Sequence, residues 1–407
     1  MPKKKRPGWK KRWAEKAGPL VAQREEREVQ QDIDAKEIAD DDSLDFATKI
    51  DRLARVRNWF SADTTVVDKY MAGELSVSEA VETLAKPVDQ AYSTANFGRQ
   101  YFNAEQTARN QRQFHSPEKA LEMWGPEQDF PEPEQKDDQG SAEMFLWDLW
   151  FSILHAAKRI PYTDEAGHEK LVDLVREFKA RPDPPAPEPM TIPLKREWIW
   201  ESGALWSELS VLGISIAEVS NDVCGCGAGW LWPEQRANEN LCAFQARLLS
   251  YGISDLTIGS HSTVPLEEAP FAGYHARERP FPLEILSHNV TRAALWTIIA
   301  GKKVYAWYPH TRDERDIEVV DRIIDQRGKE LPWNRSRRKY RGRARWETAR
   351  REFARRRFVV ESENEQLSDE VRELAAKAAK VMEDVVWDKG SSSQTDENDT
   401  VEESSET

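Results

Sequence analysis

Cysteine is scarce in this sequence: only three occur among 407 residues, at positions 224, 226 and 242. Secreted domains that depend on disulfides need an even and well-spaced set, so a disulfide framework is not expected. The N-terminal residues are basic but lack the apolar stretch of a secretory signal. We therefore expect an intracellular protein, in the nucleus or the cytoplasm, with the nucleus favoured.

Long apolar runs are also missing. A helix that spans a bilayer needs about 20 consecutive apolar residues, and the richest stretch, residues 144–157, is interrupted by polar side chains. We therefore expect no membrane partner. Strand signals are thin as well: residues 253–258 and 303–308 could each form one short strand, but no hairpin turn or strand–helix–strand rhythm accompanies them.

Motifs for metal or phosphate binding are equally sparse. The segment 224–229 (CGCGAG) supplies two of the four ligands that a structural zinc site needs. It also lacks the Gly-Lys-Ser/Thr ending of a phosphate-binding loop. We interpret it as a tight glycine-rich turn that follows a helix, and we predict no metal, no cofactor and a non-enzymatic role.

One polar stripe interrupts the apolar stretch 144–157. Asp148, Ser152 and His155 recur at intervals of four and three residues, so they share one face of a helix. They are the residue types of a catalytic triad, but neighbours along one helix do not converge on a reacting atom. We interpret them as a solvent-facing or hydrogen-bonded stripe; the alternative is that they line a ligand pocket.

The positive evidence is helical. Apolar residues recur every three or four positions in at least seven segments, most regularly over residues 367–385, where Ser368 is a candidate N-cap. Because these apolar faces must pack on one another, we predict an all-α fold. We find no fixed repeat, so the arrangement is expected to be an irregular multi-helix bundle or array with disordered charged N- and C-terminal segments.

Several helix ends can be predicted from single residues. Gly73 is expected to cap one helix, and residues 76–79 (SVSE) have the form of a capping box that starts the next. Pro87 is expected to end that helix. Residues 205–219 are expected to form four helical turns, and a helix over residues 286–300 is expected to end at the glycine that follows it.

The net charge of −14 conceals two basic islands. Residues 1–16 hold eight lysines or arginines and one glutamate. A flexible cluster of this density fits the acidic grooves of nuclear-import receptors, and the alternative is a solvated basic terminus. The candidate nuclear-import cluster is Lys3, Lys4, Lys5, Arg6, Lys10, Lys11 and Arg12. Trp9 and Trp13 within this arm suggest that it docks on something.

The second island, residues 335–358, holds twelve basic residues and two glutamates, with aromatic residues between them. This combination suits phosphate contacts and base stacking. Trp346, Ala349 and Phe353, however, have the spacing of the buried face of a helix whose arginine side is solvated. The arginines could also pair with acidic segments of their own chain. The candidate basic surface is Arg337, Arg338, Lys339, Arg341 and Arg343.

Tryptophan is abundant, with 16 residues, which indicates a folded middle of the chain. Trp198, Trp200, Trp230 and Trp232 form two Trp-x-Trp pairs near prolines. We expect them to pack in the core, and the alternative is a surface that stacks on a ligand.

The domain organisation follows from these shifts in composition. We predict a charged, largely disordered arm (1–45), an N-terminal helical unit (46–124), an acidic proline-rich linker (125–140), a main helical domain (141–388) and a disordered acidic tail (389–407).

Several segments resemble a known family. They are LWDLWFSILHAAKRIP (146–161), LVDLVREFK (171–179), NLCAFQARLLSYG (240–252), RWETARREF (345–353) and AAKAAKVMEDV (375–385). Together they are similar to a fungal family of uncharacterised proteins, domain of unknown function 3632, over roughly residues 46 to 388. The resemblance implies a helical fold and fungal origin, and it brings no activity, cofactor or site residue. The basic residues 1–16 and 335–343 are not part of it.

These observations favour a non-enzymatic protein-interaction module, nuclear in location, that binds an unidentified protein. One alternative is a nucleic-acid-associated protein that uses the basic segment 335–358. Another is an enzyme or small-molecule binder of unfamiliar type, with a pocket at the polar stripe.

Overall fold

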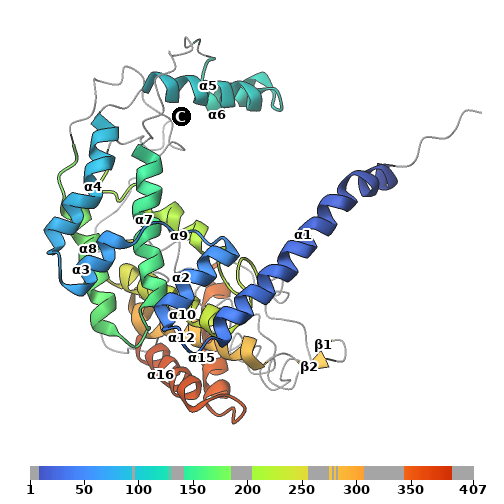
Figure 1. Ribbon diagram of the computed structural model, residues 1–407, viewed down its shortest axis with the longest axis vertical. Helices are drawn as coiled ribbons and strands as arrows, with labels where there is room; N and C mark the ends of the chain where they lie inside the picture. The colour runs from blue at the N-terminus through green and yellow to red at the C-terminus, as the bar shows by residue number, and fades with distance from the viewer. Residues whose placement is uncertain are drawn as a thin grey trace, which may run out of the picture. The chain divides into compact units, whose positions relative to one another are not determined.

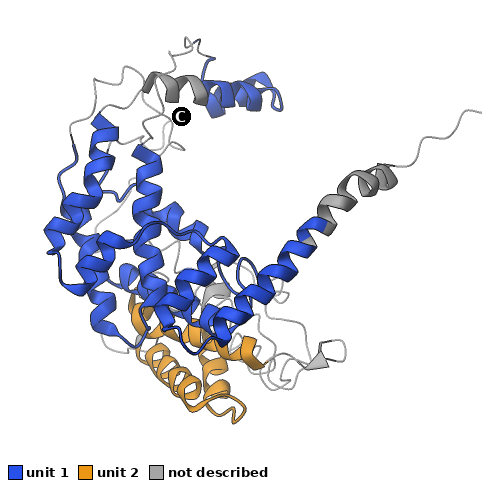
Figure 2. Ribbon diagram, viewed as in Figure 1, with its two compact units in different colours: residues 1–260 blue, residues 261–407 orange. Residues whose placement is uncertain are grey.

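The computed structural model describes residues 9–93, 97–127, 129, 142–184, 204–254, 275–276, 279–280, 283–306 and 343–386. Within these ranges lie thirteen helices and one two-stranded sheet, so the prediction of an all-α fold is confirmed (Figure 1). The chain divides into two compact units, residues 1–260 and 261–407 (Figure 2). No helix in the described ranges is long and apolar enough to cross a membrane. The predicted acidic tail lies outside these ranges.

The first unit contains ten of the described helices. They are α1 (Trp9–Asp40), α2 (Phe46–Arg57), α3 (Thr65–Ala72), α4 (Val77–Ser93), α5 (Phe97–Arg112), α6 (Pro117–Trp124), α7 (Ala142–Arg159), α8 (Glu165–Ala180), α9 (Leu212–Val219) and α10 (Trp232–Ser250). Helix α7 packs on α2, α3, α4, α8, α9 and α10 and is central to the core.

The apolar sequence of α7 explains this position. Leu146, Trp150, Ile153 and Leu154 share one face of the helix and are completely buried. Ser152, His155 and Lys158 on the other side of α7 are buried as well, so little of the helix surface is exposed in this part. Burial of each of the apolar side chains contributes about 1.5–3 kcal/mol, so α7 gains most when other helices surround it. The aromatic ring of Phe178 on α8 completes this core beside Trp150, with 5.5 Å between ring centroids.

Helix α1 occupies most of the segment that was expected to be a largely disordered arm. Its C-terminal end is anchored because Ala35 and Ala39 are buried, and Ala35 belongs to a small second core with Ile50 and Leu53 of α2. Most of its charged side chains from residue 23 onward are exposed. Ala35, Ala39 and the partly buried Ile38 are therefore enough to anchor one end of a helix in this charged segment.

The start of α4 agrees with its predicted cap, but its end does not. Gly73 has a left-handed backbone (φ 79°) and ends α3, and Glu79 Oε2 accepts hydrogen bonds from the Ser76 N–H and hydroxyl. Pro87 was expected to end α4, yet the helix continues to Ser93. A proline removes one helical hydrogen bond, but Tyr92 beyond it is 2% exposed. Burial of such residues offsets the lost bond.

The expected four-turn helix over residues 205–219 is wrong in its first half. Only α9, the last two turns, is helical, although Leu205 and Leu209 are buried as their spacing suggested. Leu209 and Val211 have left-handed backbones (φ 51° and 70°), which interrupts the helix. The indole N–H of Trp150 donates to the Ser210 carbonyl (2.7 Å) and helps to hold this turn.

The second unit contains α12 (Leu283–Ala306), α15 (Arg343–Ser362), α16 (Asp369–Val386) and the short antiparallel strands β1 (His275–Ala276) and β2 (Arg279–Pro280). Helix α16 packs on both α12 and α15. The predicted N-cap is present, because the Ser368 hydroxyl accepts from the Val371 N–H (3.4 Å).

Helix α12 passes through two predicted boundaries. Gly301 was expected to end it, and residues 303–308 were considered as a strand, but residues 301–306 are helical. Glycine in a helix interior costs only about 1 kcal/mol relative to alanine. Val304 packs against the apolar core of this unit, and its burial offsets that cost.

The unit boundary also differs from the predicted domains. Residues of α3 and α4, such as Val67 and Val88, share one core with Leu146 and Leu174 of α7 and α8. The predicted boundary at 125–140 therefore does not separate two cores. The division falls at residues 260 and 261, inside the predicted main domain.

The aromatic core yields a stability prediction. Phe178 is fully buried, and its ring centroid lies 5.3 Å from that of Trp206. Replacement of Phe178 by alanine should lower the free energy of unfolding by about 3–5 kcal/mol in a urea titration followed by circular dichroism. Phe114→Ala is the matched control, since Phe114 is 73% exposed and its loss should cost less than about 0.5 kcal/mol. Equal losses for the two variants would contradict this core.

Candidate functional site

The predicted polar stripe on α7 divides into one exposed and two buried residues. Asp148 is exposed, whereas Ser152 and His155 are 1% and 4% exposed. The Ser152 hydroxyl donates to the Leu149 carbonyl (2.7 Å), and His155 pairs with Asp51 of α2. Ser152 and His155 are thus held by different partners, and these contacts do not form a nucleophile–base pair.

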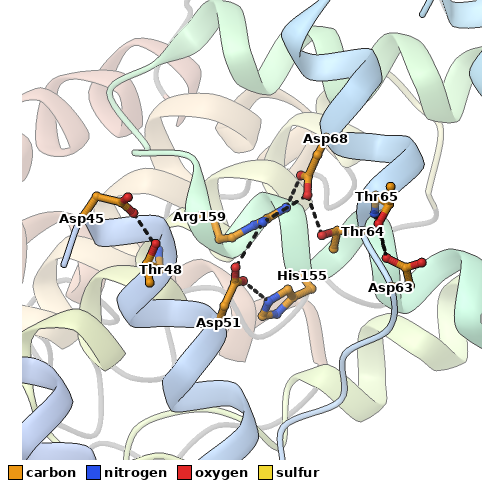
Figure 3. A network of polar contacts seen from close by, with 9 residues as sticks. All are labelled: Asp45, Thr48, Asp51, Asp63, Thr64, Thr65, Asp68, His155 and Arg159. Atoms are coloured by element: carbon orange, nitrogen blue, oxygen red, sulfur yellow. Dashed lines mark hydrogen bonds and ion pairs between the residues drawn. The ribbon is translucent and has the colours of Figure 1, made fainter. Parts of the chain in front are cut away.

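A polar network joins α2, α3 and α7 (Figure 3). We call this network the α7 clamp; it consists of His155, Arg159, Asp51 and Asp68. His155 Nε2 lies 2.8 Å from Asp51 Oδ1. Arg159, one turn further along α7, lies between two carboxylates: its guanidinium is 3.5 Å from Asp51 Oδ2 and also pairs with Asp68 of α3. The Thr64 hydroxyl donates to Asp68 (2.7 Å). Asp51 thus ties α2 to α7, and Asp68 ties α3 to α7.

Local caps fix where the two clamped helices begin (Figure 3). Asp45 accepts a hydrogen bond from the Thr48 N–H (2.7 Å) at the start of α2. Asp63 accepts from the N–H and the hydroxyl of Thr65 at the start of α3 (2.9 and 2.6 Å). Such carboxylates satisfy helix N–H groups that have no partner inside the helix. These caps set the start of the turns that carry Asp51 and Asp68.

The protonation states in the clamp follow from its burial. Burial lowers the pKa of His155, and the nearby carboxylate of Asp51 opposes this shift only in part. Partial burial would raise the pKa of Asp51, but the hydrogen bond from His155 and the charge of Arg159 outweigh it and lower the pKa. The pair is therefore a neutral imidazole that donates its Nε2–H to a charged carboxylate. Its Nδ1 is a buried acceptor with no hydrogen-bond partner among the described residues.

A second polar pair lies beside the clamp and was not found from the sequence. Lys158 and Asp222 are buried, with 2.7 Å between Lys158 Nζ and Asp222 Oδ2. Asp222 also accepts from the Phe60 N–H (3.0 Å), and Lys158 Nζ lies 4.7 Å from the ring centroid of Trp59. Burial lowers the pKa of Lys158 and raises that of Asp222, and their mutual attraction opposes both shifts. This pair ties the loop after α2 and the loop after α9 to α7.

The CGCGAG segment forms a tight turn, as the sequence indicated. Gly225 has a left-handed backbone (φ 84°), and its N–H donates to the Ala228 carbonyl (3.0 Å). Gly229 has no room for a side chain, because a Cβ atom would lie 2.5 Å from Arg57 Nη2 and 2.7 Å from Glu234 Oε2. Across the described part of the chain, no three acidic, histidine or cysteine side chains are grouped so that they could hold a metal ion.

The two predicted basic clusters lie largely outside the described residues. Residues 3–6 are outside them, and Lys10, Lys11 and Arg12 lie in the first turns of α1. Residues 337–341 are also outside, and Arg343 is the first residue of α15.

The expectation of a solvated arginine side on the 335–358 segment is wrong for part of α15. Arg357 is completely buried and pairs with Glu361 (2.6 Å). It lies three residues after buried Ala354 and next to buried Phe358, so the core face includes it. Arg355 and Arg356 both pair with Glu352. These pairs reduce the positive charge that α15 can offer to a partner.

The expected core packing is wrong for one Trp-x-Trp pair. Trp230 and Trp232 are 37% and 54% exposed, while Leu231 between them packs against the small core of α1 and α2. Trp232 stacks on Phe46 with 5.7 Å between ring centroids. Trp198 and Trp200 lie outside the described residues.

Among the large apolar side chains of the described residues, the one with the highest exposed fraction lies on the α5–α6 hairpin (residues 97–124). Phe114 is 73% exposed, and Leu121 and Met123 of α6 are 57% and 47% exposed. Helices α5 and α6 pack on each other, and neither makes comparable contact with any other described helix. Their shared interior is small and includes the buried residues Ala108 and Ala120. The hairpin falls within the predicted N-terminal helical unit (46–124), but the spacing of its residues does not indicate that Phe114, Leu121 and Met123 are exposed.

His168 on α8 is a further buried titratable group. It is completely buried and stacks on Phe244 of α10, with 6.3 Å between ring centroids. Burial, together with the positive charge of Arg247, lowers its pKa to about 4. The neutral imidazole is therefore the form that fits the core.

We expect the buried Lys158–Asp222 pair to depend on both partners. Lys158→Met should leave a buried carboxylate without its cation and lower the free energy of unfolding by about 3–5 kcal/mol. The double variant Lys158→Met/Asp222→Asn should cost less than the sum of the single variants, because it leaves no unpaired charge. Urea titrations of the wild type and the three variants measure this coupling. Additive losses would show that the two groups do not interact.

Protonation of His168 should destabilise the fold in acid. Since its pKa is lowered in the folded state, its contribution is complete above pH 6.5 and is lost as the pH falls toward 4. The loss by pH 4 should reach about 3 kcal/mol in urea titrations across this range. His168→Gln should flatten this dependence, whereas Ile214→Ser, which replaces an exposed residue without a titratable group, should leave it unchanged. An equal slope for wild type and His168→Gln would refute this assignment.

Comparison with known proteins identifies one family. A model of the family described as "Protein of unknown function (DUF3632)" matches residues 150–358. No curated protein and no solved structure matches the chain. The matched range includes His155, Lys158 and Asp222, whereas Asp51, Asp68 and the α5–α6 hairpin precede it. Because the match extends over more than half of the sequence, the chain belongs to this family of unknown function.

Proposed function

We propose that the protein is a non-enzymatic protein-interaction module that docks its partner on the α5–α6 hairpin. The observation that carries this proposal is the exposure of Phe114, Leu121 and Met123 within ten residues of one hairpin. Exposed apolar side chains cost free energy that burial in an interface recovers, at about 25 cal/mol per Å². A two-helix hairpin with a small interior is the kind of element that gains most from a third helix.

The polar groups of α7 support the non-enzymatic part of this proposal. His155, Arg159 and Lys158 are each engaged with a carboxylate from another part of the first unit. These contacts link α2, α3 and the loop after α9 to α7. Their arrangement is therefore explained by the packing of helices, without a substrate.

The proposal is tested by affinity capture from the native host with three forms of the full-length chain. The variant Phe114→Ser/Leu121→Ser/Met123→Ser should lose the partners that the wild type retains, because a polar hairpin has no apolar surface to bury. Ile214→Ser/Val359→Ser is the matched control, since these residues are 47% and 38% exposed on other helices. Partners that bind all three forms equally would rule out the hairpin as the docking surface.

We further propose that the protein acts in the nucleus and that the basic N-terminal cluster directs its import. The support is the density of cationic side chains, with Lys3–Arg6 followed closely by Lys10–Arg12. A fluorescent fusion in which these seven residues are replaced by alanine should shift from the nucleus to the cytoplasm. Arg24→Ala/Lys36→Ala, two exposed cations of α1, should leave the distribution unchanged. A wild-type fusion that stays cytoplasmic would end this proposal.

A further inference from the structure

We infer that the α5–α6 hairpin binds a basic amphipathic helix, and that this helix is the N-terminal segment of the chain itself, residues 1–22. The inference rests on the proposed docking role of the hairpin and names its occupant. Three features carry it: the charge beside the exposed apolar residues of the hairpin, the composition of the N-terminal segment, and the helical conformation of α1.

The charge around the hairpin favours a cationic occupant. Glu118 and Glu122 are exposed and one turn apart on α6, and both lie beside Leu121 on the helix surface. Two further exposed acids, Glu127 and Asp129, follow α6. Arg109 pairs with both of them, and Lys119 is an exposed cation of α6, so these four acids face two cations and the balance is negative. An apolar surface bordered by carboxylates selects partners that combine apolar and basic side chains.

The N-terminal segment has this combination. Residues 1–16 hold eight lysines or arginines and one glutamate. Trp9 and Trp13 are four residues apart in the sequence of α1, which is the spacing of about one helical turn. An apolar groove recognises an amphipathic helix through anchor side chains at this spacing. Tryptophan is also among the residues that contribute most at protein interfaces.

The position of these tryptophans in α1 leaves them far from the part of α1 that is anchored. Ala35 and Ala39 attach the C-terminal end of α1 to α2. Trp13 precedes Ala35 by 22 residues, which corresponds to about 33 Å along a helix. The basic turns of α1 therefore extend well beyond the anchor and can be offered to the hairpin of the same chain or of a second copy.

A labelled peptide tests the inference directly. A fluorescein-labelled peptide of residues 1–24 is titrated with the full-length variant Trp9→Ala/Trp13→Ala, whose own segment no longer competes, and anisotropy is measured. Binding should weaken about tenfold or more when Phe114→Ser/Leu121→Ser is added to the protein. A similar loss is expected for Glu118→Lys/Glu122→Lys, which keeps the apolar residues. Ile214→Ser is the matched control and should change nothing.

Two further measurements separate apolar docking from simple charge attraction. A peptide that carries Trp9→Ala/Trp13→Ala should bind about tenfold or more weakly although its charge is unchanged. An increase in ionic strength from about 0.1 to about 1 M should weaken the binding of the wild-type peptide as well, because salt screens the charge of the carboxylates.

Sedimentation of the wild-type chain distinguishes docking within one molecule from docking between two. Docking within one molecule leaves a monomer, whereas docking between two gives a larger species.

The inference fails if the peptide does not bind, or if it binds the hairpin variants as tightly as the parent protein. It also fails if the peptide without tryptophans binds equally, since binding would then be a general attraction to an acidic protein. Loss of captured partners in the hairpin triple variant, together with no peptide binding, would leave the proposed function intact and remove only this occupant.

Discussion

The first unit depends on the burial of one helix on almost all sides. The sequence of α7 is apolar around most of its circumference, so it gains stability only if several helices surround it. The helices that do so come from both sides of it in the sequence, including α4 before it and α10 after it. The positions of the Trp150 and Phe178 rings, and the turn at residues 204–211 that receives the Trp150 N–H, follow from this requirement.

A charged or polar side chain on a buried helix is costly without a partner, and three such side chains of α7 pair with neighbouring elements. Lys158 reaches Asp222 after α9, His155 reaches Asp51 on α2, and Arg159 reaches Asp68 on α3. Apolar packing alone tolerates a helix that slides or rotates, whereas a hydrogen-bonded pair is satisfied in one arrangement only. The clamp and the buried lysine thus select a single packing among those that the apolar surfaces would allow.

The sequence predicts those features that depend on residues close together. The helical class, the cap at Gly73, the capping box at residues 76–79 and the turn at 224–229 all follow from local patterns, and all are present. Pro87 and Gly301 do not end their helices, because distant apolar contacts outweigh a local helix-breaking tendency.

The partners in the site could not be predicted in the same way. Asp51 precedes His155 by 104 residues, and Asp222 follows Lys158 by 64, and neither separation carries a periodic signal. The stripe on α7 could be recognised from its spacing, but the residues that satisfy it could not. The exposed residues of the α5–α6 hairpin were also hidden, because their sequence is that of an ordinary amphipathic pair and only the fold shows that no other described helix covers them.

The two side chains of the Asp51–His155 pair differ in their exposure to water. The Asp51 side chain is 37% exposed, while that of His155 is 5% exposed and its second ring nitrogen is enclosed. The ring proton on Nε2 is held by the more exposed member of the pair. We therefore expect exchange of this proton with solvent to require that Asp51 on α2 first separates from the ring, which would make a buried group of α7 sensitive to the movements of α2.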